Sequence, residues 1–147
     1  MGLAVAPETA ETSRVELPSH VADLLGRTRR QGTIVAVLGA SNDRSKFGNI
    51  IVRDLVRKGF SVRPINPHAS EVCGLPCHPT LAAAGRIHIA DFVVPPEVSR
   101  RIVSDLKGSE ADVLWFQPGS FDAEVVALAR TKVPLVVAGP CIMVEAE

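Results

Sequence analysis

The stretch TIVAVLGASNDRSKFGNIIVRDLVRKG (residues 33–59) passes from an apolar run through a polar loop into an amphipathic segment. Residues 33–38 form a continuous apolar run that ends at Gly39, as expected of a parallel strand buried on both faces. Residues 49–58 carry apolar side chains at helical spacing, and Gly59 follows where glycine commonly ends a helix. This strand–loop–helix unit has the pattern of a nucleotide-binding fold.

The same alternation recurs along the rest of the chain. Further strands are predicted at 60–65, 88–94, 112–116 and 135–138. Helices are predicted at 20–30, 80–84, 95–107 and 122–130. Strands alternating with helices predict an α/β fold, a doubly wound Rossmann-like five-stranded parallel sheet with helices on both faces. We expect the strand order 3-2-1-4-5.

Composition limits the classes of partner. The 147 residues carry zero formal net charge and no stripe of Lys and Arg, which argues against nucleic acid. Residues 1–18 predict a flexible arm, and residues 19–147 a single domain with an N-terminal helix. The chain shows neither a secretory pattern nor an apolar segment of the roughly 20 residues that span a bilayer. We therefore expect a cytoplasmic protein without membrane contact; self-association cannot be read from the sequence.

Ligands of such sheets bind outside the carboxyl ends of the strands, where the connections reverse. In the predicted order, the ends of strands one to four line that crevice. They carry Gly39-Ala40-Ser41, Asn66-Pro67, Val94-Pro95-Pro96 and Phe116-Gln117-Pro118-Gly119.

The loop after strand one departs from the dinucleotide fingerprint. That fingerprint needs three glycines within six residues and an acid about twenty residues on. Gly39 has no glycine partner until Gly48, and the sequence around Asn66 has no carboxylate. Instead, Arg44 and Lys46 precede a helix N-terminus, which itself favours anions. NADP passes this test and NAD nearly fails it; alternatively, both cations are simply solvated.

Four segments, taken together and in order, resemble a known family. They are VLGASNDRSKFGN (37–49), VRPINPHASEVCGLPCHPTL (62–81), VVPPE (93–97) and LWFQPG (114–119). The set is similar to small stand-alone coenzyme A-binding proteins, which resemble the N-terminal domain of the succinyl-CoA ligase alpha subunit. The resemblance covers residue 32 to the C-terminus.

The resemblance implies coenzyme A (CoA) as cofactor and assigns parts of the ligand to segments. The loop after strand one would cradle the phosphates, the turns after strands two and three would flank the nucleotide, and the turn after strand four would line the pantetheine end. The residues so assigned are Gly39, Ala40, Ser41, Asn42, Asp43, Arg44 and Lys46; Asn66, Pro67, Val94 and Pro95; and Trp115, Phe116 and Gln117.

One position departs from the resembled pattern. The ligase subunit has a lysine shortly after the strand-two proline, and this chain has Ala69 there. Arg63, His68 or Lys46 are the candidates to supply that charge.

No residue suggests catalysis. The ligases carry their phosphoryl-accepting histidine in a second domain, which this sequence lacks. None of the four histidines, His20, His68, His78 and His88, stands in a nucleophile or relay context.

The three cysteines do not predict a metal site or a disulfide scaffold. Cys73 and Cys77 lack a second Cys/His pair at zinc-like spacing, so packing of a tight turn is the better interpretation. Cys141 follows strand five at the ligand edge, where it could exchange with the CoA thiol. We favour an inert, buried Cys141, because nothing adjacent would lower its pKa.

The sequence thus predicts non-catalytic binding of CoA or an acyl-CoA. The alternatives are a partner-dependent subunit of an acyl-CoA ligase and an NADP-binding oxidoreductase domain.

Overall fold

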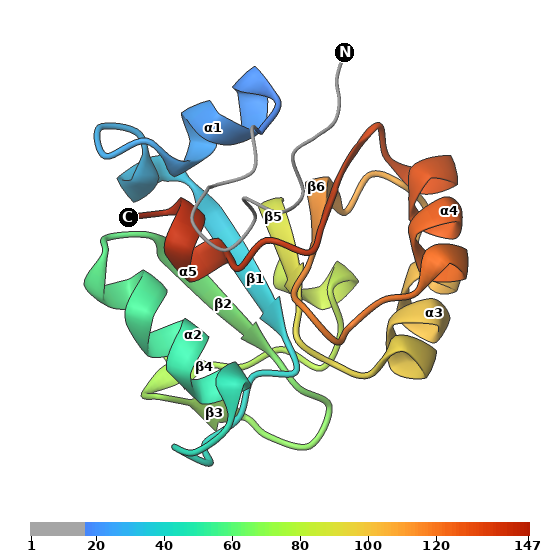
Figure 1. Cartoon of the computed structure of the whole chain (residues 1–147). Helices are drawn as coiled ribbons and strands as arrows, with labels where there is room; N and C mark the ends of the chain where they lie inside the picture. The colour runs from blue at the N-terminus through green and yellow to red at the C-terminus, as the bar shows by residue number, and fades with distance from the viewer. Residues whose placement is uncertain (1–16) are drawn as a thin grey trace.

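A computed structural model describes residues 17–147, so the arm predicted at 1–18 lies almost entirely outside the described residues. Figure 1 shows a parallel sheet at the centre of the chain, with helices on its two faces. The sheet order is β2-β1-β5-β6-β7. Its strands are β1 (Ile34–Leu38), β2 (Ser61–Ile65), β5 (Ile87–Phe92), β6 (Ala111–Phe116) and β7 (Leu135–Ala138). The predicted fold class is confirmed.

The helices divide between the two faces because the strand side chains alternate. Val35 and Val37 of β1 pack in one core with α1 (Ser19–Leu25), α2 (Phe47–Arg57) and α5 (Ile142–Glu145). Ala36 and Leu38 pack in the other core with η3 (Ala82–Ala84), α3 (Pro96–Asp105) and α4 (Ala123–Lys132). Both sheet faces are therefore apolar, which explains the continuous apolar runs of the central strands.

The predicted strand order, 3-2-1-4-5, is wrong. Numbered along the chain, the five strands lie in the order 2-1-3-4-5, because β5 pairs with β1 and not with β2. This is the other common order of doubly wound sheets. The connections now reverse between β1 and β5, so the ligand crevice is expected between those two strand ends.

Pro64 gives the physical reason for the order. Proline lacks an N–H, so within sheets it is confined to edge strands or similar positions. In β2 the Pro64 carbonyl accepts from the His78 N–H at 3.0 Å, on the side away from β1. The missing donor of Pro64 therefore faces the sheet edge, where no ladder bond is needed. A proline in this strand therefore predicts an edge position from the sequence alone.

Several local elements differ from the prediction. The first helix ends at Leu25 rather than at residue 30, because Gly26 adopts an extended conformation, and Arg30–Gly32 form a separate 3-10 turn, η2. The loop after β2 contains an unpredicted hairpin, β3 (Glu71–Val72) with β4 (Leu75–Pro76). No helix among residues 17–147 has the length and apolar character needed to cross a membrane.

One carboxyl group lies inside the sheet. Asp91 of β5 stands in register between Val37 and Trp115, and all three residues are fully buried. Neither Asp91 oxygen has a hydrogen-bond partner among the described residues. Burial raises the pKa of this carboxyl well above its ordinary value. The folded protein therefore holds a proton that the unfolded chain releases.

The pH dependence of stability follows. Below about pH 4 the carboxyl is protonated in both states, so it does not affect the pH dependence there. Above that, the free energy of unfolding falls by about 1.4 kcal/mol per pH unit until the pH reaches the folded pKa. We expect Asp91→Asn to gain stability relative to the parent as pH rises from 4 to 7, measured by urea unfolding. The exposed Asp105→Asn is the control, and a pH-independent difference for Asp91→Asn would contradict the account.

Candidate functional site

Three backbone segments approach closely where the ligand crevice is expected. Gly39, at the end of β1, has φ +96°, and a Cβ there would lie 2.6 Å from the Val93 carbonyl oxygen. A Cβ on Gly48, in the first turn of α2, would lie 2.0 Å from the Gly39 carbonyl oxygen. The strand end, the helix start and the β5 end therefore meet without intervening side chains. This brings Val94 and Pro95 directly beside the loop after β1.

The loop between β1 and α2 is held by its own side chains. Ser41 Oγ accepts from the Asp43 N–H at 3.0 Å. Asp43 Oδ1 accepts from the Ser45 hydroxyl at 2.7 Å and from the Ser45 N–H at 3.0 Å. These bonds, led by that from the hydroxyl, lower the pKa of Asp43 and keep its carboxylate charged. Ser41 and Asp43 thus serve the loop conformation, and Asp43 is not a group that attracts phosphate.

Asn42 fastens the loop to the β3–β4 hairpin. Its Nδ2 donates to the Glu71 carbonyl at 2.8 Å, and its Oδ1 accepts from the Cys73 N–H at 3.1 Å. Asn49 of α2 donates to the Ser41 carbonyl at 2.9 Å and to Cys73 Sγ at 3.4 Å. The hairpin therefore packs beside the loop, and both polar atoms of the Asn42 side chain already form hydrogen bonds to it.

Several donors of the loop remain available. Arg44 and Lys46 are exposed, and neither side chain forms a hydrogen bond or ion pair within the described part of the chain. In residues 17–147 nothing accepts from the N–H groups of Ser41, Asn42, Phe47 and Gly48. The first-turn amides belong to an 11-residue helix, whose dipole adds a partial positive charge. This arrangement can bind an anion such as a phosphate or diphosphate.

The end of β2 offers no acid for a ribose. Asn66 Nδ2 donates to the Ala40 carbonyl at 2.8 Å, and Asn66 Oδ1 accepts from the His68 N–H at 2.7 Å. The side chain of Asn66 therefore ties the β2 end to the β1 loop, and the exposed Pro67 follows it.

The candidates for the charge missing at Ala69 can be separated. Ala69 is half-buried and packs against the core. Arg63 donates to the carbonyl oxygens of Ala84 and Arg86, at the opposite end of its strand. His68 and Lys46 are exposed. Arg63 is thus already engaged, which leaves the other two.

The β6 residues are placed differently from what their assigned role suggested. The side chains of Trp115 and Phe116 are fully buried, Phe116 stacked on Phe92 with ring centroids 4.5 Å apart. In this conformation only their backbone could reach a ligand. Trp115 Nε1 donates to the Pro140 carbonyl at 2.9 Å. Trp115 therefore anchors the turn that follows β7.

Gln117 secures the same turn. Its Oε1 accepts from the Ile142 N–H at 3.0 Å, and its Nε2 lies 3.4 Å from Cys141 Sγ. Cys141 is a free, half-buried thiol at the start of α5. The turn thus lies at the carboxyl edge of the sheet, as predicted for Cys141; whether this thiol meets a ligand stays a prediction.

Of the remaining histidines and cysteines, His88 forms a contact that supports the fold. His88 Nδ1 accepts from the Ile34 N–H at 2.9 Å, and burial lowers the His88 pKa. Cys73 and Cys77 are free thiols. In residues 17–147 no three His, Cys, Asp or Glu side chains gather around a possible metal position.

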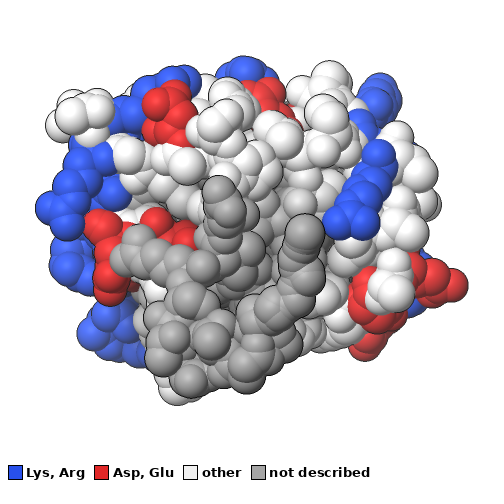
Figure 2. All heavy atoms as spheres, turned by 45° about the horizontal axis from the view of Figure 1, so that its top comes forward, with Lys and Arg blue, Asp and Glu red and all other residues white. Residues whose placement is uncertain are grey.

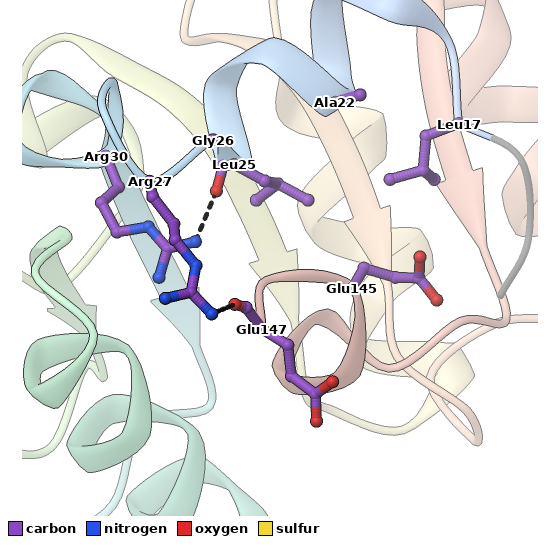
Figure 3. Close-up of a pocket in the computed structure, with 8 residues that line it drawn as sticks. All are labelled: Leu17, Ala22, Leu25, Gly26, Arg27, Arg30, Glu145 and Glu147. Atoms are coloured by element: carbon purple, nitrogen blue, oxygen red, sulfur yellow. Dashed lines mark hydrogen bonds between the residues drawn. The ribbon is translucent and has the colours of Figure 1, made fainter.

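A separate hollow lies at the amino ends of β1 and β2, between α1 and α5 (Figure 3). Arg27 Nη2 donates to the Glu147 main-chain oxygen at 3.2 Å, and Arg30 Nη2 to the Leu25 carbonyl at 2.7 Å. Arg30 also lies over the Phe60 ring, 4.9 Å from its centroid. These arginines hold α1 and α5 to the sheet, on the side opposite to the β1–α2 loop (Figure 1).

Sequence reasoning missed Gly48 and Asn42 as structural residues. The spacing of Gly48 from Gly39 breaks the dinucleotide fingerprint. Gly48 nevertheless permits the close helix–strand contact that the third glycine of that fingerprint provides. The signal was a glycine in the first turn of a predicted helix, where alanine has the better helix propensity.

Comparison with known proteins identifies the family. Residues 33–147 match the family described as CoA binding domain. A conserved hypothetical protein from Pyrococcus furiosus has 36% identity and a TM-score of 0.71, over 77% of this chain and 98% of its own. The dinucleotide-forming acetyl-coenzyme A synthetase 1 of Ca. Korarchaeum cryptofilum, solved with phosphate and ADP, has 29% identity and a TM-score of 0.65 over 81% of this chain.

The curated relatives include a much longer enzyme. An ADP-forming acetate–CoA ligase of Archaeoglobus fulgidus is 34% identical over 73 residues, 49% of this chain and 11% of the ligase. The match to the synthetase structure likewise covers 27% of that protein. The chain thus corresponds to a small part of these ligases.

Gly48→Ala tests the close contact, because helix propensity and the backbone contact predict changes of opposite sign in the free energy of unfolding. Helix propensity alone would favour alanine by up to about 1 kcal/mol. Because the new Cβ would meet backbone, we expect a loss of roughly 1–3 kcal/mol in the free energy of unfolding instead. Gly32→Ala is the matched control, since a Cβ at Gly32 meets nothing within 4 Å. An equal or greater stability for Gly48→Ala would show that the contact is not constraining.

Proposed function

Because the chain belongs to the CoA-binding domain family, we propose that it binds CoA or an acyl-CoA at the β1–β5 crevice without turning it over. The single observation that carries this proposal is the α2 N-terminus. Its first-turn amides, which no described group accepts from, and the exposed Arg44 and Lys46 belong to the loop and helix start where the chain connections reverse.

The proposed pose extends from that anion site in two directions. The diphosphate would lie against the backbone of Gly39 to Asn42 and the amides of Phe47 and Gly48. The adenosine would lie near Asn66, Pro67, Val94 and Pro95. The pantetheine arm would pass the β6 end, touching Trp115 and Phe116 through their backbone and running beside Gln117.

The attraction for phosphate is local rather than general. Formal net charge is zero, and on the face shown in Figure 2 lysines and arginines alternate with acidic side chains. On α2, for example, Arg57 and Lys58 both pair with Asp54. A small anionic ligand suits such a surface better than a nucleic acid, whose binding depends on many phosphate contacts. We propose the cytoplasm, where CoA is available, as the location.

A second candidate function comes from the relatives. The similar proteins of Archaeoglobus and Korarchaeum are a CoA ligase and an acetyl-CoA synthetase. This chain could therefore act as the CoA-binding part of a ligase whose catalytic residues lie outside it. We favour binding without turnover, because the polar contacts of the described loop and turn, including that of the Ser45 hydroxyl with Asp43, serve the local fold. Assay of acyl-CoA formation with nucleotide distinguishes the two candidates.

The ligand preference is the first test. We expect CoA to raise the unfolding temperature, since 100 times the dissociation constant of a ligand contributes about 2.7 kcal/mol. NAD should cause no comparable shift, because the Asn66 end of β2 offers no carboxylate for a ribose hydroxyl. Equal shifts with NAD, or a shift that requires the nicotinamide of NADP, would overturn the proposal.

Arg44→Ala and Lys46→Ala test the anion site. Each should weaken CoA binding by roughly 1.5–3 kcal/mol if its charge contacts phosphate, as measured by calorimetry. Because both side chains are exposed, unfolding should change by no more than about 0.5 kcal/mol. Arg101→Ala, an exposed arginine on α3, is the control. Parent-like affinity in both loop variants would mean that the cations are only solvated.

A further inference from the structure

We propose that Phe47 is a specificity-determining residue that packs against the pantetheine arm of the ligand. The inference rests on the proposed function and adds which part of CoA this residue recognises. The inference starts from the exposure of the Phe47 side chain. Phe47 is 64% exposed, although it is the first residue of α2 and directly follows Lys46 in the anion-binding loop.

Helical spacing fixes the side of α2 on which Phe47 lies. Residues 47, 51, 54 and 58 form one stripe along the helix, because side chains three and four apart share a face. Ile51 of this stripe is fully buried, and Lys58 Nζ donates to the Met143 carbonyl of α5 at 2.6 Å. The stripe therefore runs along the side of α2 that faces α5, and Figure 1 shows α5 next to α2 on the same sheet face.

The segment that leads into α5 indicates where the α5-facing side of α2 lies relative to the expected crevice. Pro140 and Cys141 are held over the β6 end by Trp115 and Gln117. Phe47 is the stripe residue nearest the carboxyl edge of the sheet. It therefore stands on the side of the anion site toward β6 and β7, and away from β2, which lies beyond β1 in the sheet.

The two ends of CoA leave the diphosphate in different directions. In the proposed pose the adenosine lies between the β2 end, with Asn66 and Pro67, and the β5 end, with Val94 and Pro95. The other arm then runs toward β6, past Phe47. Pantetheine carries a gem-dimethyl group and methylene segments, which gain from contact with an apolar ring. An exposed phenylalanine beside two cations thus matches a ligand with an anionic centre and an apolar arm.

The experiment compares two ligands on the same variants by calorimetry. The ligands are CoA and adenosine 3′,5′-bisphosphate, which contains the nucleotide part but no arm. For Phe47→Ala we expect about a tenfold loss of affinity for CoA, the order expected for lost apolar burial, and no change for the bisphosphate. Phe47→Leu should retain most of the CoA affinity. Val56→Ala, a 45% exposed apolar position on the opposite side of α2, is the control.

The possible outcomes separate failure of the inference from failure of the proposed function. Parent-like CoA affinity in Phe47→Ala overturns the inference and leaves the proposed function standing. Equal losses for both ligands also overturn it, because they place the ring on the adenine. Failure of the unmodified protein to bind CoA overturns the proposed function and the inference together. Unfolding temperatures that match the parent exclude a folding defect in the variants.

Discussion

The close approach of α2 to the end of β1 is the constraint on which the rest of the structure depends. Gly39 and Gly48 leave no room for a side chain between helix and strand. The helix N-terminus is thereby drawn down to the carboxyl edge of the sheet, and the loop between the two glycines must fold back on itself. Its side chains are used to stabilise that fold, so the backbone amides and the two loop cations are what remains for a ligand.

Side chains at the other strand ends likewise form hydrogen bonds that stabilise the fold. Asn66 ties the β2 end to the β1 loop, and Asn42 ties the loop to the hairpin. Trp115 and Gln117 fasten the turn that leads into α5. Most polar side chains at the carboxyl edge therefore form intramolecular hydrogen bonds that stabilise the fold. Ligand recognition in this chain is expected to depend on the backbone groups that these hydrogen bonds hold in place, and on a few exposed side chains.

The layered fold could be predicted because periodicity reports burial, and both faces of this sheet are buried. Strand order was harder, since alternation does not say which strands are neighbours. Pro64 carries that information, because a proline without an N–H favours an edge strand. The roles of Asn42, Trp115 and Gln117 could not be read from the sequence. Their partners, Cys73, Pro140 and Ile142, are 25 to 31 residues away and approach only in the folded chain.

We propose that CoA binds at the anion site at the α2 N-terminus. Titration of isotopically labelled protein with CoA, followed through the backbone amide resonances, tests this binding site. We expect the largest shifts at Ser41, Asn42, Phe47 and Gly48, whose amides donate to no described group. Shifts centred instead on Gly26, Arg27 and Arg30, in the hollow at the other end of the sheet, would contradict it.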